Sequence, residues 1–461
     1  MPSAIEISRL ANAAIVAPAG HGKTEIIANV AALGRRALVL THTHAGVHAI
    51  RSRLKRLGVP HFAVSVDTIA GWSMRYAHAF PGIAHPPSGM PQGAEWDQLY
   101  RGAIQALRVG AIREVVAASY DRILIDEYQD CGSLQHELAL ALSGIVPTLI
   151  FGDPMQGIFE FAEPSLSWSD TIHPHFPYGG TLETPHRWAE KNQELGAWIA
   201  ETRGKLMRGE VIDLEYGPID YRQVTTAFDM GVFFEGIETR EGSFAAIHCH
   251  KKLCYQLAKA TSGGYQAIEE MAGNRLQAFA VAWDGARNRT EGFNAITRLL
   301  DECFQKKQLE PGEAADVDDS AVEAEMNAIA AIGNGIEAAR QYFALSRKRT
   351  LWRLFRNEMW RDAERAIGEI CAGRSETMND AVARVRQRSS NSGRRLPKRT
   401  ISTPLLLKGL EFDHVVIPDA THFANEQKAQ AKLFYVAISR ATRTLTIGSS
   451  SRYLQFPKPL I

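Results

Sequence analysis

The sequence predicts an α/β protein with two parallel sheets flanked by helices and with small helical insertions. Between residues 12 and 152, short apolar runs rich in β-branched residues alternate with helical stretches, as in βαβ units. A second, split α/β pattern has expected strands at Phe244–His248 and His414–Pro418 and a helix-to-strand unit over Lys432–Gly448. Two cores suit a chain of 461 residues, because a single core rarely grows beyond about 300 residues.

The first pattern contains a series of short apolar runs, each with the length and composition of a buried strand. They are Ala13–Ala17, Ala37–Thr41, Phe62–Val66, Arg122–Asp126 and Thr148–Gly152. Between the third and fourth runs, a loop rich in Pro and Gly (Phe80–Gly93) precedes one expected helix, Ala94–Ala118. We interpret residues 78–118 as a small insertion in the first α/β domain.

The stretch at about 257–395 is polar and helical, and we expect it to be an accessory insertion. Its acidic segment Leu309–Glu325 is expected to be mobile, and the basic run Arg384–Arg399 to be a loop that is either an arm on DNA or a linker. A second basic run, Ser346–Arg361, is expected to be one helix whose charged face either contacts phosphates or is merely solvated. Its packing stripe would be Leu351, Trp352, Leu354 and Phe355.

Composition narrows the class of protein. A hydrophobic fraction of 45% and a charged fraction of 22% are those of an ordinary soluble globular protein. No apolar run of about 18 residues is present to cross a bilayer, and no basic region precedes the N-terminal apolar stretch. The 5 scattered cysteines favour free thiols, so we expect a cytoplasmic protein. With 52 basic and 51 acidic residues, a polyanion would need a local basic groove.

The strongest local signal is Ala17-Pro-Ala-Gly-His-Gly-Lys-Thr, between an expected strand and an expected helix. Gly20 and Gly22 allow successive N–H groups to face a phosphate, Lys23 would reach the β- and γ-phosphates, and Thr24 would bind Mg²⁺. The alternative is a chance Gly-rich turn, which the strand–loop–helix context disfavours. The predicted ATP-binding residues of this segment are Ala19, Gly20, His21, Gly22, Lys23, Thr24 and Glu25.

A second motif, Arg122-Ile-Leu-Ile-Asp-Glu-Tyr-Gln-Asp, is an apolar strand that ends in adjacent carboxylates. Asp126 would hold Mg²⁺ through water, and Glu127 would orient and deprotonate the attacking water. An exposed acidic turn is the alternative, but it is improbable in a chain that also carries a phosphate loop. Together the two motifs predict an ATP-hydrolysing enzyme with Mg²⁺ as cofactor.

A set of short motifs, in order, resembles those of superfamily 1A helicases of the UvrD/Rep type. The motifs are Gly20–Thr24, Asp126–Asp130, Gly152–Gln156, Pro185–Arg187, Lys408–Phe412 and Tyr435–Arg440. The resemblance implies two RecA-like P-loop NTPase cores. The first core would span residues 1–176, with the ATP site. The second would combine residues 177–265 and 396–461, with a helical accessory insertion at 266–395.

The resemblance also implies roles for single residues. Gln156 would sense the γ-phosphate, Arg187 and Arg440 would reach it from the second core as arginine fingers, and Glu411 would contact the ribose. A surface salt bridge is the alternative for each arginine. No glutamine precedes the phosphate loop, where the family reads adenine, so we expect weak selectivity among purine nucleotides.

Expected DNA contacts follow from the same resemblance. Phe159 and Phe161 fall where the family stacks single-stranded bases, and Trp72 and His42 lie in stretches similar to other DNA-facing segments. Core packing is the alternative for each of them.

The run His248-Cys-His-Lys-Lys-Leu-Cys254 raises the question of a metal site. The run follows the expected strand Phe244–Ile247, and alternation from that strand would place His248 and His250 on one side and Cys249 on the other. Such a set is a poor chelate, so no metal is expected here.

The sequence thus predicts an ATP-dependent helicase or translocase on single-stranded DNA or DNA with a 3′ overhang, moving by resemblance from 3′ to 5′. A second hypothesis is a DNA-dependent ATPase switch that regulates a partner nuclease. Compact UvrD-like proteins of the Gabija antiphage system, with their OLD-family nuclease, set that precedent. An RNA helicase stays open as an alternative. A fused nuclease is disfavoured because the sequence outside the motor motifs lacks spaced carboxylates with a lysine.

Overall fold

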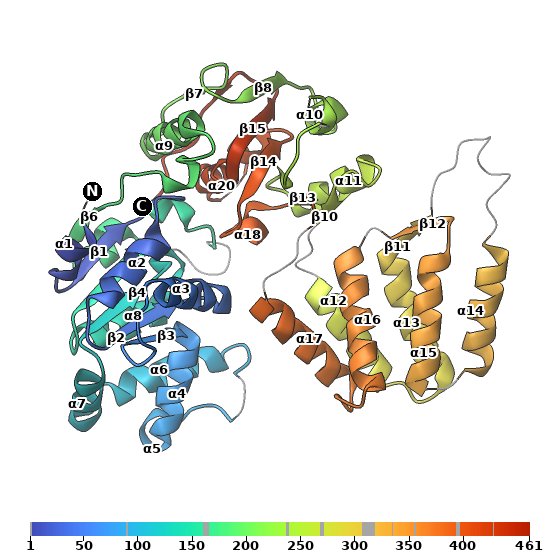
Figure 1. Ribbon diagram of the computed structural model, residues 1–461, viewed down its shortest axis with the longest axis horizontal. Helices are drawn as coiled ribbons and strands as arrows, with labels where there is room; N and C mark the ends of the chain where they lie inside the picture. Colours follow the sequence, from blue (N-terminus) through green and yellow to red (C-terminus); the bar gives the residue numbers. More distant parts are fainter. Residues whose placement is uncertain are drawn as a thin grey trace. The chain divides into compact units, whose positions relative to one another are not determined.

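The computed structural model describes the chain apart from Met1 and residues 89–90, 160–165, 237–238, 268–271, 307–318, 334, 355, 393–396 and 427. The chain divides into two compact units, one formed by residues 1–250 with 403–461 and the other by residues 251–402. Figure 1 shows the helices and strands of each.

The first sheet is wholly parallel and six-stranded, in the order β3-β2-β4-β5-β1-β6. Its strands are β1 (Ala13–Val16), β2 (Ala37–Thr41), β3 (Val64–Thr68), β4 (Arg122–Ile125), β5 (Thr148–Gly152) and β6 (Tyr178–Thr181). The helices that accompany it are α1 (Ala4–Ser8), α2 (Lys23–Ala32), α3 (His44–Arg56), α4 (Ile69–Ala79), α5 (Pro81–Ala84), α6 (Glu95–Ala106), α7 (Gly110–Ser119) and α8 (Ser133–Ser143).

Both faces of this sheet are buried, which explains why its strands are continuous apolar runs. Neighbouring residues of one strand belong to different hydrophobic clusters: Ile123 packs with Trp72 and α6, whereas Leu124 packs with Ile27 and Ile50 of α2 and α3. All six strands are parallel, so the carboxyl ends of β1, β4 and β5 meet at one edge of the sheet. The loops that follow these strands carry the polar motifs.

The expected single helix over residues 94–118 is in fact two, α6 and α7. The break has a local cause: Val109 has an extended backbone, with φ −79° and ψ 125°, and Gly110 begins the next helix. The expected loop after Phe80 contains the short helix α5.

The second sheet is also six-stranded, in the order β10-β13-β9-β14-β15-β8, and its pairings β10–β13, β9–β14, β14–β15 and β15–β8 are parallel. Its strands are β8 (Asp220–Gln223), β9 (Phe244–Ile247), β10 (Gln266–Ala267), β13 (Arg399–Ser402), β14 (Phe412–Ile417) and β15 (Ala441–Ser449). Helices of this part are α9 (Gln193–Arg208), α10 (Met230–Phe234), α18 (Pro404–Leu407), α19 (Thr421–Ala424) and α20 (Gln430–Ile438). The strands β7 (Ile212–Asp213) and β16 (Tyr453–Leu454) form a separate antiparallel pair. The two six-stranded sheets, each accompanied by helices, are the predicted RecA-like cores, and the predicted fold class is confirmed.

The unit of residues 251–402 is mainly helical and has its own hydrophobic core, in which Phe343 stacks on Trp360 with ring centroids 5.1 Å apart. Its helices are α11 (Lys251–Ala260), α12 (Ala272–Asp284), α13 (Arg289–Cys303), α14 (Ser320–Ile332), α15 (Gly335–Leu345), α16 (Asn357–Cys371) and α17 (Met378–Ser392). The short strands β11 (Phe304–Lys306) and β12 (Trp352–Leu354) pair antiparallel.

Two expectations for this unit are wrong. Residues 346–361 do not form one basic helix, because β12 pairs with β11 in the middle of the run and α16 begins only at Asn357. Phe355 of the expected stripe lies outside the described residues. Residues 384–392 are not a loop, since they form the last turns of α17. Part of the expected mobile segment, residues 309–318, lies outside the described residues, and Ser320–Glu325 begin α14.

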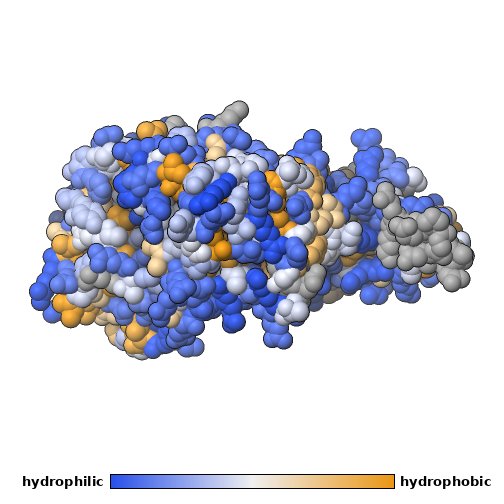
Figure 2. Space-filling view, turned by 90° about the horizontal axis from the view of Figure 1, so that it is seen from above, coloured by the Kyte–Doolittle hydropathy of each residue, from blue (hydrophilic) through white to orange (hydrophobic). Residues whose placement is uncertain are grey.

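The surface is mainly hydrophilic on the face that Figure 2 displays, with hydrophobic residues in separate patches. In the part of the chain that the structure describes, no helix is both long and apolar enough to span a membrane.

Candidate nucleotide-binding site

The loop between β1 and α2 is shaped for close approach of an anion. Gly20 and Gly22 have φ of 76° and 79°, in the left-handed region that glycine adopts without strain. A Cβ at Gly20 would lie 2.7 Å from the Trp188 ring and 2.8 Å from the Cβ of Arg187. Gly22 is the N-cap of α2, and no side chain caps this helix. The N–H groups of the first turn are thus left for a ligand, at the positive end of the helix.

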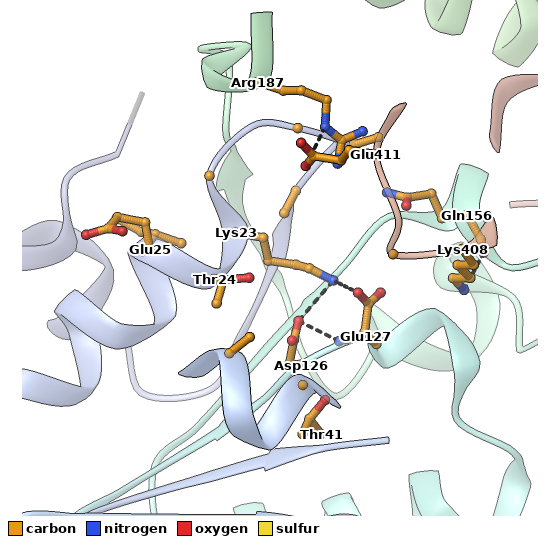
Figure 3. Close-up of a pocket in the computed structure, with 18 of the residues that line it drawn as sticks. Lys23, Thr24, Glu25, Thr41, Asp126, Glu127, Gln156, Arg187, Lys408 and Glu411 are labelled. Carbon is orange, nitrogen blue, oxygen red and sulfur yellow. Dashed lines mark hydrogen bonds and ion pairs between the residues drawn. The ribbon is translucent and has the colours of Figure 1, made fainter. Parts of the chain in front are cut away.

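Lys23, the first residue of α2, contacts both carboxylates of the second motif (Figure 3). Its Nζ is 2.9 Å from Asp126 Oδ1 and 2.6 Å from Glu127 Oε1. Both carboxylates follow β4, and Glu127 has a φ of 54°, which is strained for a residue with a side chain. Its main-chain N–H donates to Asp126 Oδ1 at 2.8 Å. This strained turn presents the two carboxylates to the same ammonium group.

The charges around Glu127 keep it ionised. Burial disfavours its charge, but the cations of Lys23 and Lys408 outweigh burial and lower the pKa of Glu127 below its ordinary value. Gln129 Nε2 also donates to Glu127 Oε2, at 2.5 Å. Burial raises the pKa of the neighbouring Asp126, and Lys23 only partly opposes this shift. Of the two carboxylates, Glu127 is therefore the one held in its ionised form.

Gln156 follows β5, in the short helix η2 (Pro154–Gln156), and is buried. Its Nε2 donates to Asp153 Oδ2 at 3.1 Å, and Asp153 Oδ1 accepts from Arg203 at 2.7 Å. The carbonyl of Gln156 accepts from Lys408 Nζ at 2.7 Å. Gln156 is thus held at the edge of the cavity through both its side-chain amide and its main-chain carbonyl.

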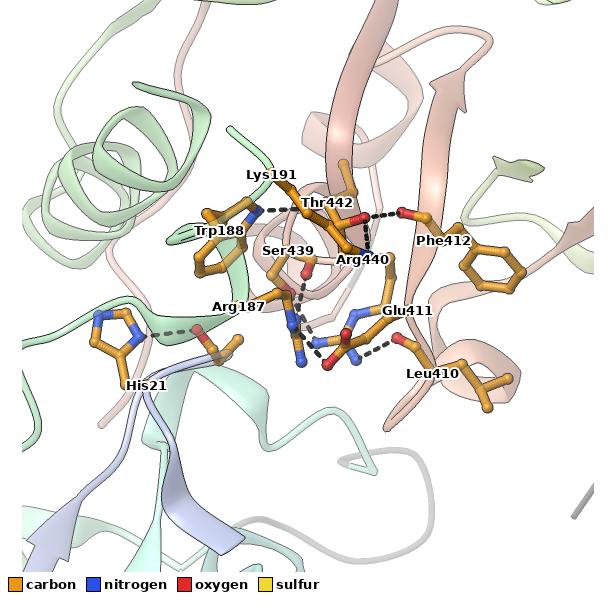
Figure 4. A network of polar contacts seen from close by, with 12 residues as sticks. His21, Arg187, Trp188, Lys191, Leu410, Glu411, Phe412, Ser439, Arg440 and Thr442 are labelled. Atoms are coloured by element: carbon orange, nitrogen blue, oxygen red, sulfur yellow. Dashed lines mark hydrogen bonds and ion pairs between the residues drawn. The ribbon is translucent and has the colours of Figure 1, made fainter. Parts of the chain in front are cut away.

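Arg187, Glu411 and Arg440 form the opposite wall (Figure 4). Arg187 Nε donates to Glu411 Oε1 at 2.9 Å, and its Nη1 donates to the carbonyl of Ser439 at 2.5 Å. Arg440 is almost completely buried, and its donors reach the carbonyls of Val436 and Leu410 and the hydroxyl of Ser439, at 2.8–3.2 Å. Burial, with Arg187 nearby, lowers the pKa of Arg440 to about 9.

Several hydrogen bonds join the two walls. Lys408 Nζ donates to both oxygens of Asp130, at 2.6 and 2.7 Å. The N–H of Ala19 donates to Tyr435 Oη at 3.0 Å, and the N–H of Arg187 donates to the carbonyl of Gly20 at 3.0 Å. Burial raises the pKa of Asp130 to about 6, although Lys408 opposes this shift. Both walls thus meet through polar contacts that leave a cavity between them.

That cavity has a volume of about 920 Å³, within the range of ligand pockets in proteins. The structure brings most of the predicted ATP-site residues to its lining: Ala19, Gly20, Gly22, Lys23, Thr24, Glu25, Asp126, Glu127, Gln156, Arg187, Glu411 and Arg440. His21 is an exception. It is buried, its Nδ1 lies 2.9 Å from the carbonyl of Ala19, and its ring packs edge-on against Trp188.

The residues expected to contact DNA lie in different environments, and not all of them are accessible. Trp72 is completely buried and stacks on Tyr76 with ring centroids 4.1 Å apart, so its expected exposure to DNA is wrong. The reason is that α4 turns Trp72 into the core of the first sheet. His42 is partly buried, with Nε2 3.4 Å from Cys131 Sγ, and burial lowers its pKa to about 4. Phe159 is 41% exposed, and its ring lies 5.2 Å from Lys408 Nζ, whereas Phe161 lies outside the described residues.

Sequence reasoning missed some residues of the site. Lys408 and Asp130 stand inside two of the quoted motifs, but only the fold shows that they bind each other. Tyr435, which accepts from the phosphate loop, likewise stands in a quoted motif without an assigned role. Their position inside the motifs was the only available signal, because their partners are hundreds of residues away.

Two family models match the chain. The model described as the UvrD/REP helicase N-terminal domain matches residues 88–175, and the model described as the UvrD-like helicase C-terminal domain matches residues 402–447. No curated protein matches.

Solved structures of helicases are similar to this chain. One is arterivirus nonstructural protein 10, a helicase, in complex with DNA, with 13% identity and a TM-score of 0.27 over 54% of this chain and 49% of that chain. Another is the Pif1 helicase from Candida albicans, with 14% identity and a TM-score of 0.26 over 52% of this chain and 53% of that chain. The chain thus spans about half the length of these proteins.

Proposed function

We propose that this chain, which belongs to the UvrD-like helicases, hydrolyses ATP with Mg²⁺ and uses the hydrolysis to move along single-stranded DNA, from 3′ to 5′. The observation that supports this proposal best is the cavity between the phosphate loop with its carboxylates and the wall of Arg187, Glu411 and Arg440. A nucleoside triphosphate needs cations and N–H donors for its phosphates and a base for the attacking water, and this cavity offers all three.

The residues of the cavity suit ATP and Mg²⁺. Thr24 and Asp126 offer the hard oxygen ligands that Mg²⁺ prefers, and both line the cavity. These two residues would hold the ion, which when bound neutralises charge on the β- and γ-phosphate oxygens. Lys23 now contacts Asp126 and Glu127, and a bound phosphate would offer it a third anionic partner at the uncapped end of α2.

For the chemical step, Glu127 is the proposed base. A water oxygen attacks the γ-phosphorus, the bond from that phosphorus to the bridging oxygen breaks, and ADP leaves. Glu127 accepts the proton of the water, for which its lowered pKa keeps it ionised. Arg187 and Arg440 stabilise the charge that develops, and Gln156 responds to the presence of the γ-phosphate.

Motion would follow from the contacts that join the two walls. The main-chain N–H of Arg187 donates to Gly20 and Lys408 Nζ donates to Asp130 across the cavity, so a change in the charge between the walls would alter the balance of these bonds. ATP binding would draw the walls together, and loss of the γ-phosphate would release them. Phe159, exposed beside Lys408, is the proposed stacking platform for DNA bases, with His42 as a further candidate contact.

A second candidate function is that of an ATPase switch which regulates a partner nuclease, such as an OLD-family enzyme in antiphage defence. The small insertion in the first core favours it, because the helices among the described residues of 81–119 are the short α5 together with α6 and α7. A motor with little surface to grip duplex ahead of it has less means to meet the ~1.4 kcal/mol cost of each base-pair step.

One experiment separates the candidates: the ATPase rate is measured with single-stranded DNA, duplex DNA and RNA in parallel, together with strand displacement from duplexes that carry a 3′ overhang. We expect strong stimulation by single-stranded DNA, weakened by salt, and unwinding of short duplexes only. Glu127→Gln serves as the inactive control. An ATPase indifferent to every nucleic acid would overturn the motor, and robust unwinding of long duplexes by the chain alone would overturn the switch.

A further inference from the structure

We propose that the second core binds one zinc ion through Cys249, His250 and Glu426, with a solvent molecule as the fourth ligand. One ligand atom of each residue, the Cys249 sulfur, a His250 ring nitrogen and a Glu426 carboxylate oxygen, lies within 4.8 Å of the other two. A tetrahedral zinc ion needs ligand atoms about 3.5 Å apart, so a small side-chain adjustment suffices.

The three residues come together because the side-chain alternation of β9 does not continue into the residues that follow it. The strand ends at Ile247, so Cys249 and His250 belong to the turn after it, where strand alternation no longer separates their side chains. Glu426 lies between α19 and α20, far away in sequence. The expectation of a poor chelate assumed that the strand continued, and the structure removes that assumption.

His250 and Glu426 already contact each other, with Nδ1 2.7 Å from Oε1. An ordinary surface ion pair would explain this contact alone, but it would not explain a thiol beside it. The Gln430 side chain donates to the main-chain carbonyls of Ala424 and Glu426, which holds the loop that presents Glu426. Cys249 and Glu426 are only partly buried and His250 is exposed, so an ion can enter from solvent.

Two further histidines, His248 and His422, form hydrogen bonds next to these ligands. The main-chain N–H of His250 donates to His248 Nδ1 at 2.9 Å, which leaves His248 Nε2 to donate to His422 Nδ1 at 2.8 Å. These bonds orient the turn that carries Cys249 and His250, as outer residues do around metal ligands. They also leave His248 and His422 engaged with each other, so the inner ligands are Cys249, His250 and Glu426.

The chemistry of the ligands selects the metal. A thiolate, an imidazole and a carboxylate together suit Zn²⁺, whereas Mg²⁺ and Ca²⁺ prefer oxygen ligands alone. Three protein ligands leave one position for solvent, which makes the ion exchangeable. The site is separate from the nucleotide cavity, whose lining contains none of these three residues.

The test uses the full-length chain, stripped of metal by a chelator and kept free of nucleotide. Co²⁺ is added as the probe, and the thiolate-to-cobalt absorption and the visible bands of tetrahedral cobalt are followed, with Zn²⁺ as competitor. We expect one equivalent of Co²⁺ per chain, displaced by one equivalent of Zn²⁺. Co²⁺ at Thr24 and Asp126 would give no thiolate absorption, so the two sites are distinguished.

Variants identify the ligands. Cys249→Ser should abolish the thiolate absorption, and Glu426→Gln should weaken Co²⁺ binding by roughly 10- to 100-fold. Cys371→Ser, which removes an exposed thiol of α16, is the matched control and should change neither. Circular dichroism checks the fold, and if Cys249→Ser unfolds, Glu426→Gln decides. The proposal is overturned if the parent chain shows no tetrahedral cobalt, or if Glu426→Gln binds like the parent.

Discussion

The two walls of the nucleotide cavity are built in different ways. The phosphate-loop wall, Gly20–Thr24 with Asp126 and Glu127, follows strands of one sheet, and its charges are already balanced against each other at 2.6–2.9 Å. The arginine wall, Arg187 with Glu411 and Arg440, satisfies its cations mainly with main-chain carbonyls and one exposed carboxylate. The cation of the first wall is therefore paired with two carboxylates, whereas the cations of the second wall are held mainly by neutral carbonyl groups.

Removal of an arginine gives the largest expected effect. If the arginine wall acts in the transition state, Arg187→Ala and Arg440→Ala should each lower kcat by roughly 10³-fold and change ATP affinity little. Single-turnover hydrolysis and equilibrium binding of a fluorescent ATP analogue measure the two quantities. Arg440 is almost completely buried and Arg187 is partly buried, so thermal unfolding of both variants serves as the control. A variant that loses affinity alone would make its arginine part of the binding wall.

Glu127 tests the opposite wall. Glu127→Gln keeps the shape of the site but removes the base, so ATP should stay bound while turnover falls roughly 10²- to 10³-fold. Lys23→Ala, by contrast, should abolish most binding, because it leaves two carboxylates facing the phosphates. Both are measured in the same assays. Near-normal ATPase activity in both variants would contradict the assigned roles of this wall.

The third prediction concerns the purine base of the nucleotide. No glutamine precedes the phosphate loop, where helicases of the UvrD/Rep type read adenine. We therefore expect kcat/KM for ATP and GTP to agree within about tenfold. Steady-state hydrolysis of both nucleotides under single-stranded DNA stimulation measures the ratio. A strong preference for ATP would reveal a substitute residue elsewhere in the lining, and Asn29 would be the first to replace by alanine.

The smallest effect concerns Asp130, which joins the walls through Lys408. Its pKa in the folded chain is about 6, above the ordinary 3.8, so folding favours its protonated form. Its contribution to stability is fully present below about pH 4 and is lost as pH rises through 6. Relative to Asp130→Asn, the parent chain should thus lose on the order of 1–3 kcal/mol of unfolding free energy between pH 4 and 7. Urea unfolding at each pH measures it. A gain over this range would mean that the Lys408 ion pair outweighs burial.

Much of the fold and site could be predicted from local patterns. The strands Ala37–Thr41 and Thr148–Gly152 have their predicted bounds, because a buried parallel strand is a continuous apolar run. The sequence misled where tertiary contacts override pattern: Ser346–Arg361 reads as a basic helix, but the pairing of β12 with β11 interrupts it. Trp72 shows the same limit, since an aromatic residue in a motif can stack on DNA or fill a core.

The sequence by itself determined which residues form the phosphate-loop wall, because a strand, a Gly-rich turn and a helix start within one short segment. It also determined that two α/β cores would be present. Only the tertiary structure decided that Lys408 binds Asp130 and that Glu426 lies beside Cys249 and His250. Such pairs join residues more than 170 positions apart, and no local periodicity encodes which distant side chains the closing sheets bring together.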